Sequence, residues 1–360
     1  MKKVFAIITA LACIFSVSAV FSSCNRSKDA DVHVFYYTYS DTYISTVRAA
    51  LDENLTKAGI SFQDHDGNNS QTTQTEQIQT AITGGAKAIA VNIVTTGSDD
   101  AAIGIVNLAK SANIPVIFFN REVSDSVVSS YDKCSFIGTN AKEAGYLQGD
   151  MIGDYLVNNF EKTDLNKDGR ISYVMFMGEK GNNEAIYRTT YSVENADAKL
   201  TAAGKPALSF YDSQNTDKYL LDREGKWSAQ AANEYMTTIL SSFNSANGNA
   251  VELIICNNDG MAEGAIAALN VAGYNTGAPG SVTVPVFGVD ATSAARELIA
   301  SGKMTGTIRQ DSEGMAEAIS TVIQNHLNGR AVASGMEKFP SDALVTKFRI
   351  PYSVYVKENG

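Results

Sequence analysis

The sequence predicts an α/β protein of two lobes, each a doubly wound parallel sheet, joined by a hinge. Short runs rich in β-branched and aromatic residues alternate with Ala-rich helical stretches, and this order favours parallel strands with helices on both faces of a sheet. The alternation restarts after a polar loop at residues 164–170. The chain has 360 residues, more than one typical domain, which also favours two lobes.

The predicted elements follow from these runs. In the first lobe, strands are expected at residues 32–37, 60–63, 88–94, 115–120 and 134–138. The helical stretches lie near residues 42–58, 71–84, 97–112 and 141–158. In the second lobe, strands are expected at residues 171–177, 208–211, 251–257, 285–289 and 305–308. The lobes are expected to join near residue 139.

The first 24 residues are predicted to be an export signal. Two lysines precede an apolar run at residues 4–21, and Ser22-Ser23-Cys24 follows. Such a segment is removed and implies a location outside the cytoplasm. Small residues before a Cys resemble a lipoprotein box, in which Cys24 would carry a lipid and residues 25–31 would form a tether. The alternative is an ordinary signal peptide with an incidental Cys.

Charge and cysteine content exclude several classes of protein. The net charge of −10 becomes −12 without the signal, because two lysines and no acid leave with it. An acidic chain without a basic run argues against nucleic-acid binding. No apolar stretch after the signal is long enough to span a bilayer. Cys134 and Cys256 lie in apolar strand-like runs and are predicted to be buried thiols rather than a bridge or a reactive pair.

The loop at residues 164–172 has the order of the first nine residues of an EF-hand calcium loop, with side-chain oxygens at alternate positions and Gly169 at the turn. The twelfth position, where an EF-hand has a bidentate Glu, is Met175, and a strand-like run follows in place of a helix. Calcium takes about six to eight oxygens, so another part of the fold would have to supply a carboxylate. The alternative is a solvated turn rich in Asp and Asn.

Polar residues stand at the ends of several predicted strands, where ligands bind in such sheets. They are Asp41, Asn120, Asn257, Asn258, Asp259 and Asp290. Carboxylates accept and amides both donate and accept hydrogen bonds, so together they suit hydroxyl groups. Tyr43 and Trp227 are candidate aromatic walls for the apolar face of a sugar. The alternative is that these Asp and Asn residues cap the following helices.

The chain resembles the bacterial galactose/glucose-binding family of periplasmic sugar receptors, which have the type I fold of ABC transporter substrate-binding proteins. The resemblance runs from about residue 32 to residue 356. Its most specific motifs are Asp164-Leu165-Asn166-Lys167-Asp168-Gly169, Ser130-Tyr131-Asp132-Lys133, Arg188-Thr189-Thr190-Tyr191, Asn257-Asn258-Asp259 and Val286-Phe287-Gly288-Val289-Asp290. We assign residues 32–139 and 311–345 to the N-terminal lobe and residues 140–310 and 346–360 to the C-terminal lobe.

The resemblance implies a structural Ca²⁺ in the C-terminal lobe. Glu252 occupies the position of the remote Glu that completes the site. Ser172 stands where the family has Gln, so calcium would bind Ser172 directly, bind it through water, or bind more weakly. The implied ligand set is Asp164, Asn166, Asp168, Arg170 through its carbonyl, Ser172 and Glu252.

The resemblance also implies a sugar pocket. Tyr43 and Trp227 would sandwich the sugar ring, while a second group would bind its hydroxyls or ring oxygen: Asp41, Asn120, Arg188, Asn258 and Asp290. Three further pocket positions depart from the family pattern, namely Asn182 for His, Glu184 for Asp and Gln310 for Asn. These departures bear on which sugar is preferred.

The predicted function is extracytoplasmic capture of a galactose- or glucose-like monosaccharide by hinge closure, with delivery to an ABC transporter permease. The alternative is a sugar-sensing module, for a chemoreceptor or a sensor kinase, without transport. A glycosidase would need a protonated and an ionised carboxyl across one bond, whereas the pocket acids are interleaved with Asn and Arg. The protein is predicted to be a monomer that meets the membrane only through its lipid, and not an enzyme.

Overall fold

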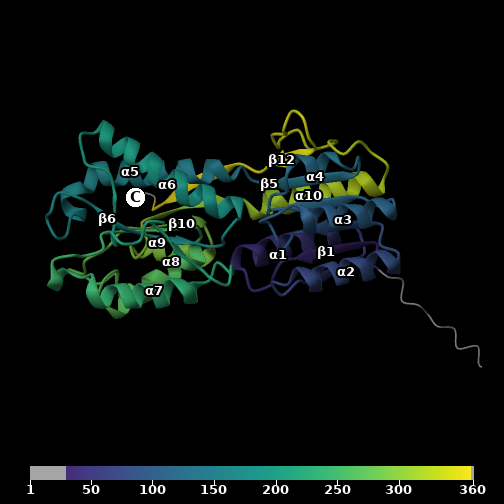
Figure 1. Cartoon of the computed structure of the whole chain (residues 1–360). Coiled ribbons are helices and arrows are strands. Elements are labelled where there is room, and N and C mark those ends of the chain that lie inside the picture. The colour runs from purple at the N-terminus through teal and green to yellow at the C-terminus, as the bar shows by residue number, and fades with distance from the viewer. Residues whose placement is uncertain (1–29, 358–360) are drawn as a thin grey trace, which may run out of the picture.

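The structure is a computed structural model and describes residues 30–357. The predicted signal at residues 1–24, the lipidation site Cys24 and the tether up to residue 29 lie outside the described residues. Two α/β lobes lie side by side, and strands near the C-terminus, drawn in yellow, run between them (Figure 1). This confirms the predicted fold class. Within residues 30–357, no helix is both long and apolar enough to cross a bilayer.

The N-terminal lobe contains a six-stranded parallel sheet in the order β12-β5-β4-β3-β1-β2. Its strands are β1 (Val32–Tyr36), β2 (Phe62–Asp66), β3 (Ala88–Val91), β4 (Val116–Phe119), β5 (Cys134–Gly138) and β12 (Lys347–Arg349). Two helices pack on one face, α1 (Thr42–Lys57) and α10 (Ser312–Leu327). Three pack on the other, α2 (Gln71–Gly84), α3 (Asp100–Ser111) and α4 (Asp125–Ser129).

The C-terminal lobe contains a seven-stranded sheet in the order β13-β11-β10-β9-β6-β7, with β8 also paired to β6. Its strands are β6 (Ser172–Met177), β7 (Ser209–Phe210), β8 (Leu220–Leu221), β9 (Leu253–Cys256), β10 (Val286–Asp290), β11 (Gly306–Gln310) and β13 (Tyr352–Val356). Only β13 pairs antiparallel, with β11. Helices α5 (Ala141–Thr163) and α6 (Asn183–Ala202) cover one face, and α7 (Ala229–Ser242), α8 (Asp259–Val271) and α9 (Ser293–Ala300) the other.

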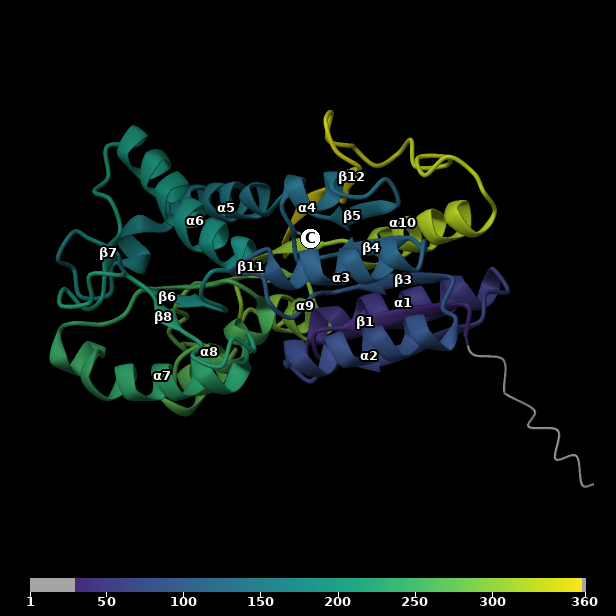
Figure 2. The same ribbon diagram turned by 45° about the vertical axis from the view of Figure 1, so that its right-hand side comes forward.

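The chain passes between the lobes three times. The crossovers lie between β5 and α5, between β11 and α10, and between β12 and β13 (Figure 2). Because β12 pairs with β5, the last segment of the N-terminal lobe continues past residue 345, where we had placed its boundary. Residues 346–349 were therefore assigned to the wrong lobe, and only β13 returns to the C-terminal sheet.

The predicted elements are present with shifted ends. Strand β2 begins at Phe62 rather than at residue 60, and α5 continues to Thr163 rather than ending near residue 158. No ranges were predicted for α4, for helices α6 to α10, or for strands β8, β12 and β13. Cys134 and Cys256 are buried free thiols, as predicted, and burial raises the pKa of Cys256 well above its ordinary value.

Candidate functional site

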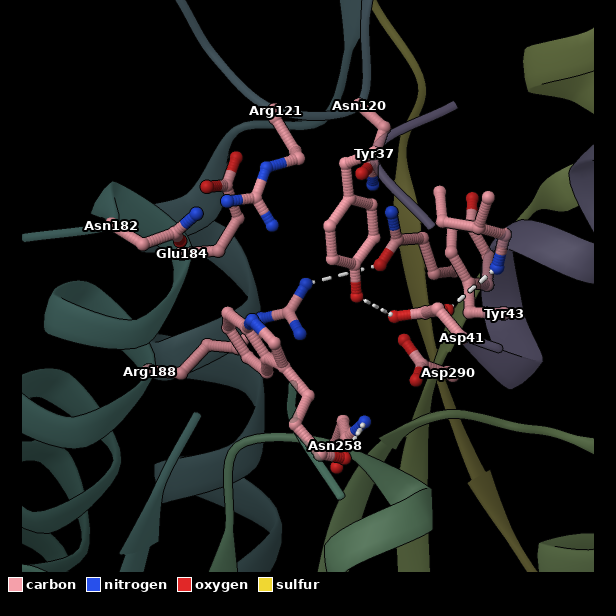
Figure 3. Close-up of a pocket in the computed structure, with 13 residues that line it drawn as sticks. Tyr37, Asp41, Tyr43, Asn120, Arg121, Asn182, Glu184, Arg188, Asn258 and Asp290 are labelled. Carbon is pink, nitrogen blue, oxygen red and sulfur yellow. Dashed lines mark hydrogen bonds between the residues drawn. The ribbon is translucent and has the colours of Figure 1, made fainter. Parts of the chain in front are cut away.

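A pocket lies between the two lobes, at the carboxyl ends of the strands (Figure 3). The structure brings all ten residues of the predicted sugar site into its wall. They are Asp41, Tyr43, Asn120, Asn182, Glu184, Arg188, Trp227, Asn258, Asp290 and Gln310. Tyr37, Ile44 and Arg121 also line it and were not predicted. Residues more than 240 positions apart in the sequence therefore form one site.

The N-terminal lobe supplies its polar groups from α1 and the end of β4. Asp41 caps α1, since its Oδ1 accepts from the backbone N–H of Ile44 at 2.7 Å, and its Oδ2 accepts from the Tyr37 hydroxyl at 2.6 Å. Asn120 has a φ of 60° and its Oδ1 accepts from the Asn92 amide at 3.0 Å. The Asn120 amide nitrogen therefore remains available as a donor.

The C-terminal lobe supplies Asn182, which caps α6, and Asn258, which caps α8. Both residues also line the pocket, so capping and binding are compatible here rather than alternatives. The Asn182 amide reaches Thr96 of the other lobe at 3.4 Å, and the Asn258 amide donates to the backbone carbonyl of Trp227 at 3.2 Å.

Two neighbouring strand-end residues do not line the pocket. Asn257 and Asp259 are fully buried. The Asn257 Oδ1 accepts from the backbone of Gly178 at 3.1 Å, and the Asp259 Oδ2 accepts from the backbone of Thr292 at 2.8 Å. These two side chains therefore support the fold and do not form the ligand contacts that were predicted for them.

Several residues at or beside the pocket have left-handed backbone conformations. Besides Asn120, Trp227 has a φ of 55°, Asp290 a φ of 125°, and Ala291 a φ of 56°. Such conformations cost about 1–3 kcal/mol each and persist only where the surrounding fold enforces them, often at binding sites. Here they turn the Asp290 carboxylate and the Trp227 indole toward the space between the lobes.

Arg188 lies at the centre of the site. Its Nη1 donates to the backbone carbonyl of Asn257 at 2.9 Å, and its Nη2 donates to Gln310 Oε1 at 3.0 Å and to the Tyr352 hydroxyl at 2.9 Å. Its guanidinium also lies 5.7 Å from the centre of the Trp227 ring. The side chain is buried, and protein acceptors hold its guanidinium in place.

Four buried polar atoms in the pocket wall have no hydrogen-bond partner among residues 30–357. They are Glu184 Oε1, Arg188 Nε, Gln310 Nε2 and Arg121 Nε. An unpartnered buried polar atom costs about 1–3 kcal/mol, so such a cluster points to a polar ligand or to ordered water. The atoms include an acceptor and three donors, as a ligand carrying hydroxyl groups requires.

Burial also shifts the pKa of two pocket acids. It raises the pKa of Glu184 to about 7, although the nearby Arg188 acts in the opposite direction. Burial raises the pKa of Asp290 well above its ordinary value, again against the effect of Arg188. Glu184 therefore changes charge near neutral pH, and burial favours the neutral form of Asp290 as well.

The unpredicted Arg121 connects the two lobes. Its Nη2 is 2.5 Å from Glu179 Oε2, and Glu179 also accepts from the Trp227 indole at 3.4 Å. The Arg121 guanidinium lies 4.3 Å from the centre of the Tyr37 ring. Arg121 directly follows Asn120, and Tyr37 ends a predicted strand. Both positions lie at strand ends, so the rule that identified the other pocket residues could also have identified these two.

The predicted calcium loop joins α5 to β6, and Glu252 lies against it. The Glu252 Oε1 accepts from the backbone of Leu165 at 2.7 Å and of Asn166 at 3.2 Å, and its Oε2 accepts from that of Ser172 at 2.9 Å. Gly169 has a φ of 78°, and its backbone donates to Asp164 at 2.9 Å. The predicted contact between Glu252 and the loop is therefore present.

The loop contains carboxylate and amide oxygens, which are the ligands that a hard cation such as Ca²⁺ prefers. In this conformation, however, these oxygens accept from backbone amides, for example Asp168 Oδ1 from Arg170 at 2.9 Å. The Ser172 hydroxyl donates to the carbonyl of Ala250 at 2.6 Å. Within the described part of the chain, no three His, Cys, Asp or Glu side chains converge as a metal site. Calcium binding stays a prediction.

Comparison with known proteins gives a family and several relatives. The periplasmic binding protein domain family matches residues 32–331. The chain is 34% identical over 345 residues to the D-galactose/methyl-galactoside binding periplasmic protein MglB of Haemophilus influenzae, covering 96% of this chain and 93% of that protein. It is 26% identical over 322 residues to a putative rhizopine-binding protein of Rhizobium meliloti, covering 89% and 88%.

Solved structures agree in fold. An ABC transporter solute-binding protein of Bacillus halodurans with bound myo-inositol superposes with a TM-score of 0.69 at 25% identity, covering 93% of this chain and 97% of that one. A periplasmic solute-binding protein of Actinobacillus succinogenes with bound D-allose superposes with a TM-score of 0.68 at 20% identity, covering 91% and 97%. The second likeness concerns the fold alone.

Proposed function

Because the chain belongs to the periplasmic binding protein family, we propose that it is an exported solute-binding protein that captures a monosaccharide between its lobes. The observation that carries this proposal is the interlobe pocket, whose wall combines three carboxylates, three side-chain amides of Asn, two arginines and aromatic rings. Its unpartnered buried donors and acceptor suit hydroxyl groups. Periplasmic binding proteins close by hinge motion around such ligands.

We propose a galactose- or glucose-like hexose as the ligand. The similarity to a galactoside-binding relative over 96% of the chain supports this choice. Asn182, Glu184 and Gln310 set this pocket apart from the family pattern that it resembles. Each keeps hydrogen-bonding capacity while changing length or charge, so they are expected to alter the order of preference among sugars.

Trp227 allows a direct test, because it is the only tryptophan of the chain and lines the pocket. The mature chain is titrated with D-glucose, D-galactose, D-ribose and D-xylose while Trp227 fluorescence is recorded. We expect a saturable change at micromolar hexose. No change with any sugar, confirmed by calorimetry on folded protein, would contradict the proposal.

We propose that the loaded protein delivers its sugar to an ABC transporter permease. Membership of a periplasmic family supports export, and Cys24 would attach the mature chain to a membrane by its lipid. A second candidate is sugar sensing through a chemoreceptor or sensor kinase without transport. Affinity purification of the full chain from its native membrane would distinguish transport from sensing, since a permease or a sensor would be recovered with it.

The protein is proposed to act as a monomer.

The chain is a binding protein and not an enzyme. Its relatives and structural neighbours are solute-binding proteins. The acids Asp41, Glu184 and Asp290 lie in a wall that also contains Arg121 and Arg188. They are placed to hold hydroxyls rather than to work as an acid and a base across one bond.

We also propose that the loop at residues 164–172 binds Ca²⁺ as a structural ion. The order of oxygen-bearing residues and the contact of Glu252 with the loop support this proposal. A small conformational change would have to turn carboxylates from backbone amides toward the ion. Chelation should lower the melting temperature of wild type but not of Glu252→Gln, while sugar still binds at low temperature. A wild-type melting temperature that does not respond to calcium would contradict the proposal.

A further inference from the structure

One residue from each of the three crossovers meets in a single hydrogen-bonded network around Arg188. Thr139 follows β5 at the first crossover, Gln310 ends β11 at the second, and Tyr352 begins β13 at the third. Arg188 donates to Gln310 and to Tyr352, and the Tyr352 hydroxyl donates to Thr139 Oγ1 at 2.8 Å. All four side chains are buried.

This network fixes which donors of Arg188 remain for a ligand. A guanidinium has five N–H donors, and protein acceptors take three of those on Nη1 and Nη2. The donor on Nε is buried and has no partner among the described residues. The Tyr352 hydroxyl can accept from Arg188 only while its own proton points elsewhere, and Thr139 provides the acceptor for that proton.

The rings on either side restrain the guanidinium further. Its carbon lies 5.7 Å from the centre of the Trp227 ring and 5.9 Å from the centre of the Tyr352 ring. The backbone of Thr139 is itself held, because its carbonyl accepts from Arg349 at 2.8 Å. Arg188 is thus anchored to the crossovers and not only to its own helix.

We propose that Tyr352 is a positioning residue for sugar binding: its hydroxyl, oriented by Thr139, holds the Arg188 guanidinium so that its free donors face the pocket. Tyr352 does not line the pocket itself. Its effect on binding passes through Arg188, and the hydroxyl pair that carries it spans the two lobes at the hinge. The inference rests on the proposed function, since it concerns the binding of a sugar in that pocket.

The test compares Tyr352→Phe with Tyr355→Phe, which removes a hydroxyl from the same strand but outside the network. Binding of D-galactose and D-glucose is measured by calorimetry on folded, full mature chains. A hydrogen bond to a charged group is lost only in the first variant, so we expect its affinity to fall about tenfold or more. The affinity of Tyr355→Phe should stay within about twofold of wild type.

Monodeoxy sugars distinguish positioning from a general structural effect. Removing one sugar hydroxyl lowers the affinity of wild type by an amount that depends on its position. The hydroxyl bound by Arg188 is the one whose removal costs wild type most among the positions where that loss becomes smaller in Arg188→Lys. Tyr352→Phe should reduce the cost of removing that same hydroxyl and leave the costs at other positions unchanged. An equal change at every position, or unchanged affinity with only a lower melting temperature, would overturn the inference.

Thr139→Val provides a second route if Tyr352→Phe does not fold. It removes the acceptor of the Tyr352 proton and should weaken binding with the same positional pattern but to a smaller extent. The wild-type titration separates the two proposals. A wild type that binds no sugar overturns the proposed function and this inference together, whereas sugar binding with wild-type affinity in both variants overturns this inference alone.

Discussion

Glu184 shows how the environment of one residue sets its chemistry. Its side chain is 5% exposed and lies one helical turn before Arg188 on α6. Burial raises its pKa from the ordinary value of 4.5 to about 7, which means that the folded protein favours the neutral carboxylic acid. Below neutral pH this residue is therefore a donor as well as an acceptor for a sugar hydroxyl.

The same shift predicts how Glu184 affects stability. Between pH 4.5 and 7 the folded state keeps a proton that the unfolded state has lost, so the free energy of unfolding falls as the pH rises across this window. At about 1.4 kcal/mol per pKa unit, the whole effect is on the order of 3 kcal/mol. Glu184→Gln removes it, so the stability of wild type relative to the variant should decrease from pH 4.5 to pH 7.5.

Urea unfolding at several pH values measures this difference. Exposed Glu76 on α2 provides the control, since Glu76→Gln removes a carboxyl that is not buried. Other buried acids, such as Asp259 with a pKa raised by burial to about 7, titrate in the same window but cancel in the comparison. A difference between wild type and Glu184→Gln that does not vary with pH would show that folding leaves the pKa of Glu184 unchanged.

The residues of the site differ in how far the sequence could reveal them. Asp41, Asn120, Asn258 and Asp290 follow strands, and the edge where parallel strands end is a general binding position. Glu179 gave no such signal, because its role arises from Arg121 on the opposite lobe. A contact across the cleft depends on how the lobes meet, which local sequence patterns do not contain.

At the scale of elements, strand β12 shows why short strands were missed. Lys347 and Arg349 make its sequence look like an exposed segment, yet the Lys347 side chain is 2% exposed. Its ammonium pairs with Glu122 at 2.9 Å and with Asp125 at 2.7 Å, and Arg349 pairs with Asp342 at 2.7 Å. Paired charges can be buried, whereas a hydrophobicity pattern assumes that they are not.

The end of β6 carries a second constraint that the sequence pattern did not reveal. Gly178 follows β6, and the ring of Trp227 packs directly over its Cα, so that an added Cβ would overlap the indole. A glycine here allows the close approach of an aromatic wall to the backbone. The position of Trp227 in the pocket thus depends on β6 as well as on its own segment.

Gly178→Ala should therefore displace Trp227. Overpacking of this kind costs about 1–3 kcal/mol of stability, and we expect sugar affinity to fall at least tenfold with a red shift of the tryptophan emission in free protein. The matched control is Gly104→Ala within α3, where an added Cβ meets no atom within 4 Å. It should stabilise the protein by up to about 1 kcal/mol. Wild-type emission and affinity in Gly178→Ala would contradict the packing described.

At the scale of the whole molecule, the two lobes touch across the pocket. Arg121 pairs with Glu179, Thr96 reaches Glu179 at 3.4 Å, and the Asn69 amide donates to the carbonyl of Glu224 at 3.0 Å. The two-lobed architecture was predictable from the repeated alternation of strands and helices. These contacts were not, because they depend on how the two lobes are oriented relative to each other, an arrangement that Figure 2 shows.

The Arg121–Glu179 pair is the charged contact among these interlobe contacts. Removing its charge should therefore weaken the association of the two lobes. Glu179→Gln keeps an acceptor for Trp227 and Thr96 but removes the charge opposite Arg121, whose side chain is only 5% exposed. Removing one partner of such a pair leaves the other charge buried and uncompensated, which costs more than breaking an exposed pair. We expect the free variant to be more open, with a larger radius of gyration in solution scattering, and its sugar affinity to fall several-fold.

Glu224→Gln is the matched control, because it breaks an exposed pair with Lys226 inside one lobe and leaves the backbone contact to Asn69 in place. Its scattering and affinity should match those of wild type. Saturating sugar should bring Glu179→Gln back to the wild-type radius of gyration, since ligand binding energy favours the closed arrangement. If Glu179→Gln has the same radius and affinity as wild type, closure does not depend on this pair, and the hydrogen bonds around the pocket hold the lobes together.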